Sequence, residues 1–256
     1  MQRKRKHFVS DLHMFARRSS AAMMQRAIES AVLNSDVFIL GGDIFDFRWS
    51  RYSSHEETAE QGLRWLQDLL SLNPHCDIHY ILGNHDANPE MTHRLLSLAQ
   101  RKGSFQVHPH LLRLEDSVFL HGDIIDANLP LNDRFHAALD QLRHRGEQRR
   151  RPPWIQHAMY DAVVKTRIHR LVAHAANANP RVLDRVARYL AWAGCDQDAG
   201  VQHVYFGHTH RPLHRVPFAG LQFSNPGASI YGMDCRILAI GDDGESISHP
   251  PNGNAS

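Results

Sequence analysis

Five short apolar runs recur along the chain, and each ends abruptly in Asp, Asn, Gly or His. The runs cover residues 7–11, 36–43, 78–85, 117–123 and 203–208. Continuous apolar runs bounded by turn residues are typical of strands that are buried on both faces. We therefore predict five buried strands at these positions.

Helical patterns separate the first three runs. Ser19 or Ser20 can cap the first helix. A second helix is predicted to begin in a capping box formed by Ser54 and Glu57, and a third at Pro89, a residue type favoured at the first helical position. Strands that alternate with helices in this way predict an α/β fold.

The pattern changes between residues 126 and 200, where apolar positions recur at helical spacing. Three helices are predicted there, over residues 131–147, 154–178 and 181–193. We interpret this stretch as a helical insertion that covers the open end of a β core. Strand signals return at residues 213–217, 221–224 and 235–240. The predicted organisation is a single domain of residues 1–256 with an insertion at 126–200 and a flexible tail at 242–256.

The composition is that of a globular protein, with 42% hydrophobic and 22% charged residues in a chain of 256. No apolar run approaches the ~20 residues of a membrane span, and the basic start lacks the apolar segment of a signal peptide. The three cysteines are far apart, so we expect neither a disulfide framework nor a thiolate metal site. A cytoplasmic location is the resulting expectation.

The net charge is only +2, but it is unevenly distributed. Between Arg134 and Arg188 there are 12 Lys and Arg against 4 Asp and Glu, which leaves 17 against 23 in the rest of the chain. This basic stretch is either a solvated helical face or a platform for an anionic substrate.

Side chains that could bind metal follow every one of the five runs. They are Asp11 and His13; Asp43 and Asp46; Asn84, His85 and Asp86; His121 and Asp123; and His208 and His210. Ligands of open α/β sheets bind outside the carboxyl ends of the strands, so we expect these groups to converge on one crevice. Residues at i and i+2 of an extended chain point the same way, which would aim both members of a D-x-H or H-x-H pair into one pocket.

The donor types are carboxylate, imidazole and amide, without thiolate. We expect Mn²⁺ first for such donors, with Fe, Zn or Co as alternatives, because imidazoles are poor ligands for Mg²⁺ or Ca²⁺. A set with this many donors is too large for one ordinary ion and suits two ions that share a carboxylate. Two such ions would lower the pKa of a bridging water and supply hydroxide for in-line attack on phosphorus. Each motif alone also occurs as an ordinary turn. A metal site is therefore indicated only by the five motifs together.

In this order, the motifs D-x-H, G-D-x-x-D, G-N-H-D, H and G-H-x-H resemble those of the calcineurin-like metallophosphoesterase family. The resemblance extends from Asp11 to His210. It implies a four-layer α/β/β/α sandwich over a dinuclear metal centre. By position, it implies one metal held by Asp11, His13, Asp43 and His210, and a second held by Asn84, His121 and His208 with Asp43 as the bridge. Residues 225–229 (NPGAS) are also similar to a loop of this family.

The resemblance also implies roles for residues near the metals. His85 would stand near the leaving group as a general acid or charge stabiliser, and Asp46 would orient His85 and make it more acidic. Asp86 and Asp123 are interpreted as supporting or turn residues.

Within the family, the chain looks like the UDP-2,3-diacylglucosamine hydrolase branch in its length, its "GDIFD" motif and its helical insertion. This implies cleavage of a pyrophosphate bond in lipid A biosynthesis at the inner membrane, with peripheral membrane contact through the insertion. Members of that branch have Arg where this chain has His85. The chain could therefore also be a more distant relative of the branch.

Two other functions remain open. The same motifs are similar to exonuclease members of the family, in which case the basic insertion would contact a nucleic-acid backbone; no ladder of aromatic residues for stacking bases supports this. The other alternative is a binding module without catalysis, but a degenerate member would have lost ligands, and every ligand position is filled here.

Overall fold

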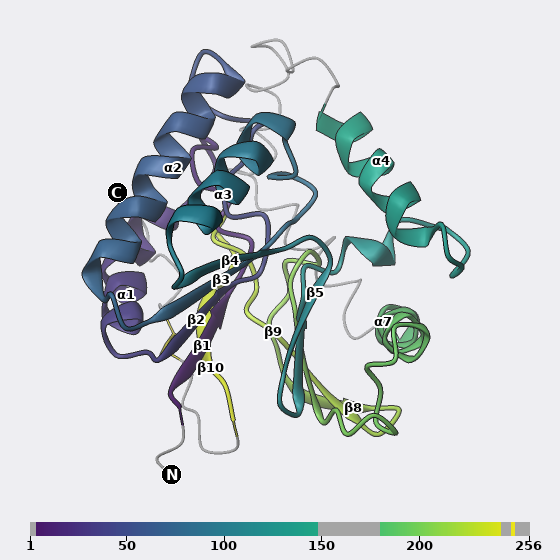
Figure 1. The fold of residues 1–256 in the computed structure, drawn as a ribbon. Coiled ribbons are helices and arrows are strands. Elements are labelled where there is room, and N and C mark those ends of the chain that lie inside the picture. Colours follow the sequence, from purple (N-terminus) through teal and green to yellow (C-terminus); the bar gives the residue numbers. More distant parts are fainter. Residues whose placement is uncertain (1–3, 148–179, 242–246, 249–256) are drawn as a thin grey trace.

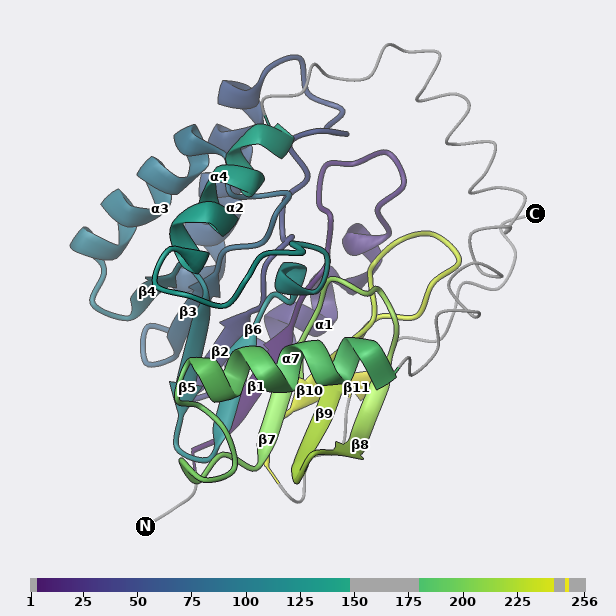
Figure 2. The same ribbon diagram turned by 90° about the vertical axis from the view of Figure 1, so that its right-hand side faces the viewer.

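The computed structural model describes residues 4–147, 180–241 and 247–248 and has four layers (Figure 1). Two β-sheets face each other in the middle, and helices cover the outer face of each (Figure 2). The α/β/β/α sandwich expected from the sequence is confirmed.

The first sheet has six strands in the order β11-β10-β1-β2-β3-β4. Its strands are β1 (Lys6–Val9), β2 (Val37–Leu40), β3 (Asp77–Ile81), β4 (Phe105–His108), β10 (Arg236–Ala239) and β11 (Ile247–Ser248). Strands β1 to β4 run parallel, so their carboxyl ends lie along one edge. The helices over this sheet are α1 (Ala21–Leu33), α2 (His55–Leu72) and α3 (Pro89–Arg101).

The second sheet has five strands in the order β5-β6-β7-β9-β8. Its strands are β5 (Leu111–Leu114), β6 (Ser117–Leu120), β7 (His203–Phe206), β8 (Leu213–Phe218) and β9 (Leu221–Asn225). Helix α7 (Pro180–Trp192) lies across the outer face of this sheet (Figure 2), and residues of η1 (Asp123–Ile125) and α4 (Phe135–Glu147) pack into the same apolar cluster. Strands β6 and β7 are parallel.

All five predicted strands exist, but they belong to two sheets rather than to one open sheet. Strands β1, β2 and β3 lie in the first sheet, whereas β6 and β7 lie in the second. The division occurs at β4 and β5, which the apolar pattern did not reveal because their exposed positions interrupt it.

Three apolar clusters hold the layers together. One fills the space between α1, α2, α3 and the first sheet, and another lies between the second sheet and helices α4 and α7. Between the sheets, the ring of Phe119 stacks on Tyr205 at 5.0 Å and tilts against Phe8 at 5.7 Å. Burial of such a side chain contributes about 1.5–3 kcal/mol, so this contact fixes one sheet against the other.

Helices α2 and α3 start where the sequence signals place them, whereas the side chain of Ser20, the residue before α1, makes no capping hydrogen bond. The Ser54 hydroxyl caps α2 by accepting from Glu57 N at 3.0 Å, as a capping box requires. The Glu57 carboxylate, however, accepts from Ser53 N at 3.0 Å and not from the cap residue. Asn88 caps α3, and Pro89 is its first residue as predicted.

Two of the three helices expected between residues 126 and 200 lie in the described part. Helix α7 agrees with its prediction, whereas α4 begins at Phe135, four residues later than expected. The helix predicted over residues 154–178, and most of the tail at 242–256, lie outside the described residues. The insertion as a unit and the division into one domain stay predictions. None of the described helices is long and apolar enough to span a membrane.

Candidate metal centre

The expected ligands lie in loops just past the strand ends. Five of them have positive φ: Asp11 (53°), His13 (44°), Asp43 (52°), His208 (64°) and His210 (57°). The i, i+2 argument for an extended chain is therefore wrong in its geometry, since β1 and β7 end before these residues. Asp and His are among the few residue types that tolerate left-handed backbone, and such strained positions cluster at functional sites.

Asp11, His13 and His210 form the first group of donors. His210 Nε2 lies 3.3 Å from Asp11 Oδ1, and His13 Nε2 lies 3.0 Å from His210 Nε2. Burial lowers the pKa of His13 to about 4. The imidazole is therefore neutral, which is the form that binds metal.

Asp43, Asn84, His121 and His208 supply the second group. Nε2 of His121 lies 3.1 Å from Asn84 Oδ1 and 3.4 Å from Asp43 Oδ2, and its Nδ1 lies 3.1 Å from the Gly41 carbonyl oxygen. A proton on Nδ1 donated to this carbonyl leaves Nε2 for a metal, as in many metal-ligating histidines.

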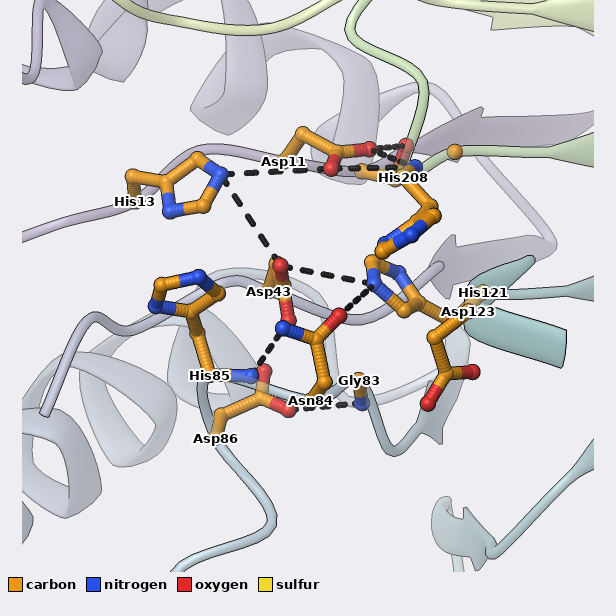
Figure 3. A network of polar contacts seen from close by, with 12 residues as sticks. Asp11, His13, Asp43, Gly83, Asn84, His85, Asp86, His121, Asp123 and His208 are labelled. Atoms are coloured by element: carbon orange, nitrogen blue, oxygen red, sulfur yellow. Dashed lines mark hydrogen bonds and ion pairs between the residues drawn. The ribbon is translucent and has the colours of Figure 1, made fainter. Parts of the chain in front are cut away.

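Asp43 joins the two groups. Its Oδ2, which faces His121, also lies 3.9 Å from His13 Nε2 (Figure 3). The other oxygen, Oδ1, accepts a hydrogen bond from His85 N at 2.7 Å. One carboxylate therefore faces ligand candidates from both groups, as a shared ligand must.

Close backbone approach also shapes the site. A Cβ on Gly207 would stand 2.1 Å from Asp11 Oδ2, so only glycine fits between β7 and this carboxylate. The approach lets His208 N donate to both Asp11 oxygens at 3.0 Å. Asn225, the first residue of the NPGAS loop, donates to the Gly207 carbonyl at 2.9 Å and supports the same turn.

His85 and Asp46 lie beside these groups. His85 Nδ1 is 3.3 Å from Asp46 Oδ1, and His13 Nδ1 is 3.4 Å from Asp46 Oδ2. Burial opposes the charged form of His85, but the carboxylates of Asp46 and Asp43 raise its pKa to about 9. The contact brings Asp46 to His85 as expected, but the expectation that Asp46 makes His85 more acidic is wrong, because a nearby anion stabilises the imidazolium.

The two remaining carboxylates support the loops. Asp86 accepts from Gly83 N at 2.7 Å, from Ile44 N at 2.8 Å and from the Tyr80 hydroxyl at 2.7 Å, which ties the turn after β3 to the loop after β2. Asp123 accepts two hydrogen bonds from Arg143 of α4, at 2.7 and 2.9 Å. Neither carboxylate is among the residues of the compact donor groups.

Sequence reasoning missed three residues near the donors. Asp126 Oδ2 lies 2.9 Å from His208 Nε2, which leaves Nδ1 of His208 for a metal. Arg18 donates to Asp46 at 3.3 Å. Arg48 follows Asp46 by two residues and lines a neighbouring cavity. None of the three belongs to a spaced motif, and only their charge set them apart.

The cavity has a volume of about 320 Å³ and opens beside the donor groups. Asn84, His85 and His208 form part of its wall, and Leu139 and Leu142 of α4 form another part. The volume lies at the lower end of the range for small-molecule sites. A ligand held there would contact both the donor groups and an apolar surface.

The donor set fits two divalent ions. Asp11, His13 and His210 offer ligand atoms within 4.8 Å of one another, and so do Asp43, His121 and His208. The ligand atoms of His13, Asp46 and His85 are equally close to one another. Short distances alone therefore do not distinguish the expected metal ligands from Asp46 and His85. Carboxylate with imidazole suits Mn, Fe, Zn or Co.

Comparisons with known proteins place the chain among its relatives. The family model "Calcineurin-like phosphoesterase" matches residues 5–212. The fold is similar to a dimetal phosphatase from Danio rerio, with 13% sequence identity and a TM-score of 0.47 over 96% of this chain and 98% of that one. It is also similar to a protein assigned as a 5′-nucleotidase from Staphylococcus aureus, with 13% identity and a TM-score of 0.41 over 98% of this chain and 55% of that one.

No curated protein matches the chain. The family model nevertheless covers most of the sequence, and it includes all of the motif residues that converge at the two donor groups. The chain belongs to the calcineurin-like phosphoesterase family and is a metal-dependent phosphoester hydrolase.

Proposed function

We propose that the protein hydrolyses a pyrophosphate bond in a nucleotide-linked substrate, as UDP-2,3-diacylglucosamine hydrolases do. The observation that carries the proposal is the cavity beside the donor groups, which has a polar wall at Asn84 and His85 and an apolar wall at Leu139 and Leu142. Such a cavity suits a phosphate joined to a partly apolar body. A lipid-linked substrate would also place the protein in the cytoplasm at the inner face of the membrane.

The residues have the roles that the motif positions imply. Asp11, His13, Asp43 and His210 would hold one divalent ion, and Asn84, His121 and His208 would hold the other, with Asp43 available to both. We propose Mn²⁺ as the metal. When bound, the two ions supply the hydroxide nucleophile and offset the charge of the phosphoryl oxygens.

His85 donates a proton to the leaving oxygen. The Asp46 carboxylate lies 3.3 Å from Nδ1 of His85, where it favours the protonated imidazole and orients the ring. The Asn84 side chain, beside His121, contacts the phosphoryl group through its amide nitrogen, since its oxygen faces the imidazole.

Metal analysis combined with a substrate panel tests the proposal. The purified protein is expected to contain two divalent ions and, with Mn²⁺, to hydrolyse nucleotide-linked pyrophosphates faster than DNA. Salt-sensitive hydrolysis of DNA in preference to these substrates would support the exonuclease alternative. Failure to hydrolyse even bis-p-nitrophenyl phosphate with Mn²⁺ would favour a binding module.

A further inference from the structure

Arg48 lies in the loop between β2 and α2, and the proposed mechanism does not use it. Its side chain lines the cavity together with Asn84 and His85. Its Nε is buried and, within the described part of the chain, has no hydrogen-bond partner. A buried donor without a partner is unfavourable unless a ligand satisfies it.

The guanidinium of Arg48 is supported at one face. Its central carbon lies 5.6 Å from the centre of the Trp49 ring, within the range of a cation–π contact. Trp49 N in turn donates to Asp46 Oδ1 at 2.8 Å, which ties this loop to the carboxylate beside His85. Arg48 is therefore placed on the same framework that orients His85.

Other charged side chains of the cavity already contact partners of opposite charge or an ionisable histidine. Arg143 makes a double hydrogen bond with Asp123, and Asp126 contacts His208 at 2.9 Å. In the described structure no carboxylate forms an ion pair with Arg48. Among the described residues of its lining, Arg48 is thus the one permanent cation without an anionic partner, and it lies next to the groups assigned to the scissile phosphate.

The apolar part of the lining restricts where a second anionic group can bind. The side chains of Ala127, Leu139 and Leu142 offer no donor, and Arg143 is paired with Asp123, so among the described residues of the lining Arg48 is the partner left for an anion beyond the scissile phosphate. Guanidinium groups match phosphate oxygens in a two-pronged arrangement, and they do so better than a lysine ammonium.

We infer that Arg48 is a specificity-determining residue that binds the phosphate adjacent to the scissile phosphate. The cavity then favours diphosphate-linked substrates over esters of a single phosphate. The inference rests on the proposed function, because it assigns the neighbouring end of the cavity to the scissile phosphate.

The test compares Arg48→Gln with Arg51→Gln, which removes an exposed arginine of the same loop. UDP-N-acetylglucosamine supplies two phosphates, and the p-nitrophenyl ester of thymidine 5′-phosphate supplies one; both are assayed with Mn²⁺. Arg48→Gln is expected to raise KM for the diphosphate about 10- to 100-fold, the effect of losing a charged hydrogen bond. The KM for the single-phosphate ester and both KM values of Arg51→Gln stay at the wild-type level.

Arg48→Lys keeps the charge without the planar fork and is expected to fall between wild type and Arg48→Gln for the diphosphate alone, which separates anion binding from loss of fold. An equal rise in KM for both substrates, or none for either, would overturn the inference. So would wild-type protein that hydrolyses only the single-phosphate ester. Hydrolysis of neither substrate by the wild type would instead refute the proposed function.

Discussion

At the residue scale, Asp43 is the side chain on which the centre depends most. A single oxygen of its carboxylate faces His121 at 3.4 Å and His13 at 3.9 Å, one from each donor group. The residue is 1% exposed and has a left-handed backbone at φ 52°. A strained backbone conformation persists only where the surrounding structure holds it in place. At Asp43, the neighbouring donor residues are part of that structure.

Replacement of this carboxylate tests whether it is shared. Asp43→Asn is expected to abolish hydrolysis and to weaken binding of both metals, because the neutral amide removes the negative charge between them. Metal content by mass spectrometry and activity with bis-p-nitrophenyl phosphate are the measurements. Asp68→Asn, on the exposed side of α2, is the matched control and should keep both. Loss of only one ion would contradict the shared role.

Loss of His85 should lower the rate of the reaction without lowering the metal content, in contrast to loss of a metal ligand. His85→Ala is expected to lower kcat about 10²- to 10⁴-fold, as for loss of a general acid, while the metal content stays. The loss should be smaller with a p-nitrophenyl leaving group, which departs without a proton. His75→Ala, at an exposed histidine, should match the wild type. If the His85→Ala protein loses its metals, His85 is a ligand and not an acid.

At the element scale, helix α4 is attached to the centre through one buried ion pair. Arg143 is 4% exposed, donates twice to Asp123 and donates to the Pro109 carbonyl at 2.6 Å. Burial alone disfavours ionised Asp123, but Arg143 outweighs it and lowers the pKa of the carboxyl to about 2. This pair positions the apolar wall of the cavity next to the end of β6.

Removal of the cation should leave a buried, uncompensated charge. Arg143→Met is expected to reduce the free energy of unfolding by about 3–5 kcal/mol, measured by urea denaturation. Arg145→Met, at an exposed arginine of the same helix, should change it by no more than about 0.5 kcal/mol. Adding Asp123→Asn to Arg143→Met should restore part of the loss. A double variant less stable than Arg143→Met would show that the carboxylate does not depend on this arginine.

The strands differ in how well the sequence predicts them. Apolar runs located β1, β2, β3, β6 and β7 because these strands are buried along nearly all of their length. Strands β4 and β5 escaped because exposed positions interrupt their apolar pattern. The candidate ligands were found by residue type and motif order, whereas their left-handed backbone has no signal in apolar periodicity. Asp126 was missed because only tertiary packing brings it to His208, and Arg48 was missed because it belongs to no spaced motif.

At the scale of the whole molecule, the centre lies where the two sheets meet. Asp11, Asp43 and Asn84 follow strands of the first sheet, and His121 and His208 follow strands of the second. Aromatic packing between the sheets supports the same arrangement from within. Bound ions would therefore link the two halves of the sandwich as well as serve the reaction.

Removal of metal should consequently destabilise the entire fold. A ligand present at about 100 times its Kd stabilises the native state by about 2.7 kcal/mol, and 1 kcal/mol shifts Tm by about 2–4 °C in a chain near this size. Chelation is therefore expected to lower Tm by about 5–10 °C in a single cooperative transition, with recovery on adding Mn²⁺. Asp43→Asn should show a much smaller shift under the same treatment. If chelation leaves the wild-type Tm unchanged, the ions do not link the sheets.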